Sequence, residues 1–319
     1  MSTPLTPPAG TAPASATRPR RLQVSPQRYR VVTAVALAMI AAIVVTGAAV
    51  RLTESGLGCD TWPNCSEGQF VEFGTPNQTI EQVNRLFTGL VSVSVIAAVL
   101  GSLWRVPRRK DLVVWSLALV AGVLGQIVLG GITVLVDLHP AAVSGHFVLS
   151  MVLLAAAVTL VWRARQEPGP RAPRVPALQL NLSRVALAGA CALMITGPIV
   201  TGSGPHAGDA EAKRFGFSIP DVVRIHSINM WIFLGSVVVL LVLLARSSTA
   251  ADVLRRAQLL LVAIVAQGAI GYTQYALDIP EGLVLAHIAG ATLVLGLTVW
   301  FHLGLSAPVA DTAIPEASG

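Results

Sequence analysis

Three histidines stand at one depth in three strongly apolar segments, and they carry the clearest chemistry in the chain. His146, His226 and His287 each follow a short polar stretch and open an apolar run. An imidazole inside a membrane-like layer is costly unless it is hydrogen-bonded or ligates a metal. A packed structural histidine explains any one of them, but three at matched depth favour ligation. Copper or zinc would usually recruit Cys, Met or carboxylate ligands as well, so the pattern predicts heme iron.

Two of these histidines occupy equivalent positions in an internal repeat of an apolar helix, a short loop and a second apolar helix. A displacement of 141 residues aligns Gln126, Gly130, Asp137 and His146 with Gln267, Gly271, Asp278 and His287. The glutamine and glycine of each copy share a helix face. The glycines would make room for a flat macrocycle, or else they serve close helix packing. We expect His226 and His287 to be axial ligands of a b-type heme.

A cation would stabilise the propionates of such a heme, and Arg224 stands near the expected outer boundary of its helix. Simple interfacial snorkelling explains the same position equally well.

The first half of the chain differs at the place where a matching histidine is expected. It reads Glu81-x-x-Asn84-Arg85, with Asn84 at the ligand position. Glu81 and Asn84 share a helix face, although an acid near a helix start is also favoured by the helix dipole. The front pocket would therefore contain His146, Glu81, Asn84, Arg85, Gln126 and Gly130. This asymmetry predicts a rear heme that stays bound and a front site that carries out chemistry.

The elements that must position these residues are membrane-spanning helices. The chain of 319 residues is 54% hydrophobic and 12% charged, with a mean hydropathy of +0.69. Eight apolar blocks are long enough to cross a bilayer: 31–50, 84–104, 112–135, 141–162, 182–202, 223–245, 253–276 and 282–303. The sequence predicts an all-α integral membrane protein built as two parallel repeats of four-helix bundles.

The distribution of positive charge predicts the orientation in the membrane. The N-terminal tail and the second, fourth and sixth loops hold 17 of the 22 basic residues. The positive-inside rule places both termini in the cytoplasm of a cell-membrane protein. No soluble basic domain is present to bind nucleic acid. The expected divisions are a disordered tail (1–30), a front half (31–162), a basic linker (163–181), a rear half (182–303) and a C-terminal tail (304–319).

Cys59 and Cys65 lie in the first long loop, on the expected outer side. In an oxidising compartment such a pair can close a small disulfide loop, with two free thiols as the alternative. Zinc is disfavoured because no further Cys or His stands nearby in that loop.

The chain resembles the heme A synthase family of membrane oxidases, in its bacterial, loop-cysteine-containing type. The resemblance covers residues 30–303 and includes the eight helices, the loop cysteines, Glu81 to Arg85, and the histidines. It implies hydroxylation of a methyl group of heme O twice, with loss of water to leave the formyl group of heme A. It further implies heme b on His226 and His287, heme O on His146, catalytic assistance from Glu81, and a Cys59–Cys65 disulfide.

The family pattern has a histidine where this chain has Asn84, so ligation of the substrate heme by two imidazoles is in question. The resemblance also implies a heme O synthase, which is a prenyltransferase, as the upstream partner and a terminal cytochrome oxidase as the user of the product.

Two other functions share part of this pattern. A b-type electron carrier would use the rear site but leaves Glu81 and the unequal halves unexplained. A heme-handling transporter would explain the duplication, but the histidines stand near the outer face rather than the bilayer midplane.

Overall fold

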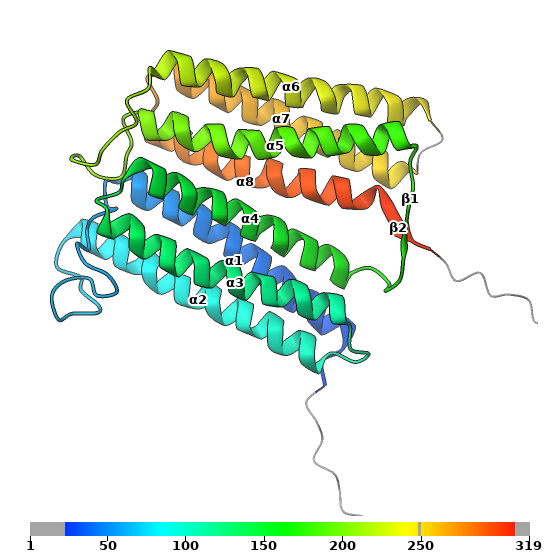
Figure 1. Ribbon diagram of the computed structural model, residues 1–319, viewed down its shortest axis with the longest axis horizontal. Coiled ribbons are helices and arrows are strands. Elements are labelled where there is room, and N and C mark those ends of the chain that lie inside the picture. The colour runs from blue at the N-terminus through cyan, green and yellow to red at the C-terminus, as the bar shows by residue number, and fades with distance from the viewer. Residues whose placement is uncertain (1–22, 248–249, 310–319) are drawn as a thin grey trace, which may run out of the picture.

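The computed structural model describes residues 23–247 and 250–309, and within them it confirms an all-α protein with eight helices long and apolar enough to cross a membrane (Figure 1). The helices are α1 (Pro26–Leu52), α2 (Pro76–Trp104), α3 (Lys110–Leu135), α4 (Pro140–Ala164), α5 (Ala177–Ser203), α6 (Ile219–Arg246), α7 (Ala251–Ala276) and α8 (Glu281–Gly304). The protein is thus a multi-pass membrane protein.

Each predicted span lies within one observed helix, but several helices begin earlier than the apolar block. The largest difference is in α2, which begins at Pro76 rather than near residue 84. Thr75 caps the Gln78 N–H, and the Gln78 side chain accepts from the Thr75 N–H, which forms a capping box. Such caps satisfy the free N–H groups of a helix start. The polar first turns therefore extend the helix beyond its apolar block. In the same way α1 begins at Pro26, inside the segment expected to be a tail.

The helices form two bundles that lie side by side, a front bundle of α1–α4 and a rear bundle of α5–α8 (Figure 1). The bundles meet through α1 and α4 on one side and α5 and α8 on the other. Val91 and Val95 of α2 are buried, and so are Phe233 and Val237 at the equivalent positions of α6. This matching burial is consistent with the internal duplication.

A short antiparallel strand pair links the two bundles at one end. Strand β1 (Arg171–Pro173) pairs with β2 (Ser306–Pro308). The sequence predicted only a linker and a tail here, because two three-residue segments show no periodicity of their own. The pair forms where α4 and α8 end and α5 begins. Nearby, the Arg256 guanidinium lies 4.7 Å from the ring centroid of Trp162 and 4.6 Å from that of Trp300, which joins α4, α7 and α8.

The bundle has two distinct ends. We call the end with the strands the arginine end. The opposite end, with loops 53–75, 136–139, 204–218 and 277–280, we call the histidine end, because α4, α6 and α8 begin there and carry His146, His226 and His287 in their second turns. The two long loops at this end contact each other, since the Gly56 N–H donates to the Gly208 carbonyl at 2.9 Å.

Candidate functional site

The rear bundle brings the rings of His226 and His287 close together in an edge-on arrangement. His226 is seven residues into α6 and His287 is six residues into α8. Their ring centroids are 6.4 Å apart, and the ring planes make an angle of 66°. A metal ion bound by two imidazoles has nitrogens about 2 Å away on each side, which puts the ring centres roughly 6 Å apart. The spacing therefore fits one iron between the two rings.

Thr196 on α5 contacts the ring of His226. The Thr196 hydroxyl lies 2.8 Å from Nδ1 of His226 and 3.0 Å from the Ala192 carbonyl. When its hydrogen is on that carbonyl, the hydroxyl accepts from Nδ1–H. In that tautomer Nε2 keeps a free lone pair, which is the form that ligates a metal. Thr46 of α1 stands 150 residues before Thr196, at the equivalent position of the front half.

Glycines on the neighbouring helices make room for the imidazole rings. A methyl group at Gly271 of α7 would lie 2.9 Å from Cε1 of His287. At Gly197 of α5 it would lie 3.5 Å from Cε1 of His226. Gln267 donates to the His287 carbonyl at 2.7 Å and so ties α7 to α8. Gly271, the glycine of the repeated glutamine–glycine pair, thus lets α7 and α8 approach until the edge of the His287 ring contacts the α7 backbone.

The front bundle repeats this arrangement around His146. A methyl group at Gly130 of α3 would lie 3.3 Å from Cε1 of His146, and Gln126 donates to the His146 carbonyl at 3.2 Å. Nδ1 of His146 and Nδ1 of His287 are both buried and have no hydrogen-bond partner among the described residues. The two helix pairs therefore present their histidines in the same way.

Asn84 occupies the position in α2 that His226 occupies in α6. The Thr46 hydroxyl donates to Oδ1 of Asn84 at 2.9 Å, just as Thr196 contacts His226 in the rear bundle. A methyl group at Gly47 would meet nothing within 4 Å, whereas its counterpart Gly197 faces the His226 ring. The shorter asparagine thus leaves open the space that a second imidazole takes in the rear bundle.

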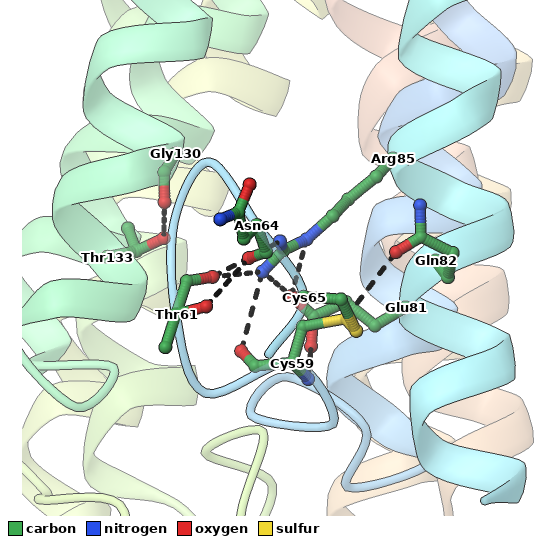
Figure 2. A network of polar contacts seen from close by, with 9 residues as sticks. All are labelled: Cys59, Thr61, Asn64, Cys65, Glu81, Gln82, Arg85, Gly130 and Thr133. Atoms are coloured by element: carbon green, nitrogen blue, oxygen red, sulfur yellow. Dashed lines mark hydrogen bonds and ion pairs between the residues drawn. A yellow bond between two sulfur atoms is a disulfide. The ribbon is translucent and has the colours of Figure 1, made fainter. Parts of the chain in front are cut away.

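Glu81 is buried at the start of α2, with 6% of its surface exposed, and both of its carboxylate oxygens are occupied (Figure 2). Oε1 accepts from Nη2 of Arg85 at 2.5 Å and from Nε at 2.9 Å. Oε2 accepts from the Cys59 N–H at 2.8 Å. A carboxylate with these partners is held rigidly beside the loop that carries Cys59.

Arg85 extends this network into the first loop. Its guanidinium donates to the carbonyls of Cys59, Thr61 and Asn64 (Figure 2). The predicted disulfide between Cys59 and Cys65 is confirmed, and both cysteines are fully buried. Arg85 is therefore committed to Glu81 and the disulfide loop, which the sequence did not reveal.

The disulfide loop reaches the wall of the front pocket through Trp62. A methyl group at Gly131 of α3 would lie 2.7 Å from Cδ2 of Trp62, so the indole packs directly on this glycine. Gly131 follows Gly130, which contacts His146. No sequence signal pointed to Trp62, because its contact joins residues far apart in the chain. Arg224 is exposed near the start of α6, and its predicted role toward a propionate stays a prediction.

Comparisons with known proteins show which family the chain belongs to. A family model for cytochrome oxidase assembly proteins (COX15-CtaA) matches residues 30–73 and 69–210. Curated relatives named heme A synthase include one from Lysinibacillus sphaericus (strain C3-41), 29% identical over 37% of this chain and 39% of the relative. Another, from Sinorhizobium medicae (strain WSM419), is 25% identical over 88% of this chain and 91% of the relative.

A third, from Rhodopseudomonas palustris (strain BisB18), is 27% identical over 50% of this chain and 52% of the relative. Except for the Sinorhizobium protein, the chain spans about two fifths to half of the length of the curated relatives it matches. The family model covers α1 to α5, which is more than half of the chain and includes Glu81 and His146. The chain belongs to the cytochrome oxidase assembly protein (COX15-CtaA) family.

Proposed function

We propose that this protein is a heme A synthase, an oxidoreductase that converts the methyl group of heme O into the formyl group of heme A by successive hydroxylations. The observation that carries the proposal is the inequality of two otherwise equivalent pockets. The rear pocket has two neighbouring imidazoles, and the front pocket has His146 and, at the position equivalent to His226, Asn84. One pocket suits a permanently bound heme and the other suits a heme that is exchanged and modified.

In the rear pocket, His226 and His287 would hold heme b. The fit rests on the 6.4 Å separation of their rings and on the Nδ1 contact of His226 with Thr196. Bound there, heme b supplies one-electron transfer. The protein's own contribution is to fix the ring orientations, through Thr196 on one side and through Gly271 and Gln267 on the other.

In the front pocket, His146 would ligate the iron of heme O, surrounded by Asn84, Gln126 and Gly130. The open space beside Gly47 supports a vacant sixth position on the side of Asn84. Converting a methyl group to a formyl group removes four electrons, so an external oxidant must accept them. The residues present hold the substrate and do not supply that oxidant.

Glu81 would act on the reaction by its charge. Its carboxylate is ion-paired with Arg85 and accepts from the Cys59 N–H, so it is poorly placed to carry a proton away. A fixed negative charge can instead stabilise positive charge that develops at the reacting carbon. Of the two roles open to a carboxylate near the methyl group, the geometry favours this one.

We further propose that the arginine end faces the cytoplasm, with both termini there, and that the protein resides in the cell membrane. The excess of basic residues in the loops at the arginine end supports this orientation. A heme O synthase would supply the substrate and a terminal cytochrome oxidase would use the product.

The proposal is tested by adding heme O to membranes that contain the protein and analysing the extracted hemes. Heme A or its hydroxylated precursor is expected with the wild-type chain and is expected to be absent with His146→Ala. His302→Ala is the matched control, because His302 lies at the arginine end of α8 and bonds to Ser183. Unchanged heme O beside a reducible b-type heme would instead identify an electron carrier, and absence of any heme spectrum would favour a transporter.

A further inference from the structure

The rear bundle is closed toward the lipid by an aromatic pair next to its heme pocket. Nε1 of Trp231 on α6 donates to the hydroxyl of Tyr272 on α7 at 2.9 Å. Both side chains are on the lipid-facing surface, 57% and 49% exposed. Trp231 is five residues after His226, and Tyr272 follows Gly271, which contacts His287. The pair therefore joins α6 to α7 on their exposed surface, close in sequence to His226 and Gly271.

The front bundle has glycine at both equivalent positions. The displacement of 142 that relates Asn84 to His226 places Gly89 where Trp231 stands, and the displacement of 141 places Gly131 where Tyr272 stands. Gly89 is exposed, and a methyl group there would meet nothing within 4 Å. The α2–α3 side thus lacks the bridge that closes the α6–α7 side.

The remaining cover on the α2–α3 side comes from a loop rather than from the helices. Trp62 of the disulfide loop packs on Gly131 from the histidine end. Below it, the surfaces of α2 and α3 carry exposed aliphatic side chains, including Leu86, Leu90, Ile127 and Val128. Aliphatic side chains of this kind suit contact with an isoprenoid chain, which stays within the bilayer.

We propose that the prenylated heme enters the front pocket and leaves it laterally between α2 and α3, with Trp62 as the outer lid of this portal. This inference rests on the proposed function, because it concerns the exchange of that substrate. In the rear bundle, the Trp231–Tyr272 bridge closes the equivalent α6–α7 face and keeps the resident heme in place.

The portal is tested by filling it. Gly89→Trp places an indole where the rear bundle has one, and Gly235→Trp is the matched control, because Gly235 is exposed on α6 and also has nothing within 4 Å. We expect Gly89→Trp to slow uptake of heme O from lipid vesicles about tenfold or more, with unchanged heme b content. Gly235→Trp should take up heme O at the wild-type rate.

Gly89→Leu is a smaller filling variant and serves if the tryptophan variant does not fold. Wild-type uptake by a folded Gly89 variant would overturn the portal while leaving the proposed function intact. Failure of the wild-type protein itself to bind heme O would overturn both.

Removing the Trp231–Tyr272 bridge from the rear bundle is the converse test. The double variant Trp231→Gly, Tyr272→Gly recreates the front sequence in the rear bundle, and we expect it to pass heme b to apomyoglobin about tenfold faster than wild type. Tyr272→Phe keeps the ring but removes the hydrogen bond and should give an intermediate rate. Release at the wild-type rate by the double variant would overturn the closing role of the pair.

Discussion

The Thr196 hydroxyl lies 2.8 Å from Nδ1 of His226 and 3.0 Å from the Ala192 carbonyl, so it can orient the imidazole with Nε2 free to bind iron. A partner that orients a ligating histidine is worth about 10–100-fold in metal affinity. We therefore expect Thr196→Val to weaken heme b binding by a factor of about 10–100. Titration of the heme-free protein with heme, followed by absorbance, measures the change.

The control for this change is Thr201→Val, one turn further along α5, whose hydroxyl donates to the Gly197 carbonyl. It removes the same group without touching His226. Equal affinities for the Thr196 and Thr201 variants would show that the hydroxyl does not orient the ligand.

Asn84 is expected to decide the coordination of the front heme. With heme O bound, the wild-type protein should show a five-coordinate or weak-field iron signal in EPR, and His146→Ala should remove it. Asn84→His should convert that signal to a low-spin form with two imidazoles, because the position matches His226 and the space beside Gly47 is open. A bis-imidazole signal in the wild-type protein would mean that another histidine is the ligand.

The Glu81–Arg85 pair is expected to support both stability and reaction. Glu81→Gln leaves the largely buried Arg85 without its counter-charge, and removing one partner of such a pair costs about 3–5 kcal/mol in free energy of unfolding. Thermal unfolding in detergent measures this loss. Conversion of heme O should also fall, since the fixed charge is gone, while the rear heme stays bound.

Asp111→Asn is a useful comparison, because Asp111 pairs with Arg109 at the arginine end, far from the pockets. Asp111→Asn should lower the free energy of unfolding, but bound heme O should still be converted at the wild-type rate. If the Glu81→Gln protein converts bound heme O at the wild-type rate, the role of the Glu81 carboxylate is structural only.

The disulfide between Cys59 and Cys65 is expected to resist reduction in the folded protein. Both cysteines are fully buried, and the Cys59 N–H and carbonyl are held by Glu81 and Arg85. Treatment with dithiothreitol followed by alkylation and mass spectrometry should leave the pair unlabelled until the protein is denatured. Rapid labelling of Cys59 in folded protein would show that the loop opens.

Replacing the disulfide should loosen the lid of the front pocket. The double variant Cys59→Ala, Cys65→Ala is expected to lower the unfolding free energy by about 2 kcal/mol, because the loop regains freedom in the unfolded chain. It should also speed release of bound heme O, since Trp62 is carried by the same loop. Trp62→Ala, with the disulfide intact, separates the second effect from the first.

Much of this protein follows from local sequence. Eight apolar runs of bilayer length determine eight helices, because every backbone polar group in hydrocarbon must be satisfied within its own segment. The repeat that pairs Gln126 and His146 with Gln267 and His287 predicted that two pockets share one design, and the paired cysteines predicted the loop disulfide.

Only the tertiary structure decided which partners these residues meet. Thr196 and His226 are 30 residues apart in the sequence, and Trp62 and Gly131 are further apart still. Strands β1 and β2 pair although all four rear helices lie between them in the chain. The hydrogen bond between Trp231 and Tyr272 in the rear bundle also depends on how α6 and α7 face each other. Within the described residues, the front bundle has no such bridge, because Gly89 stands at the position of Trp231. Hydropathy and periodicity record the environment of a segment, but they carry no information about which side chain of another helix packs against it.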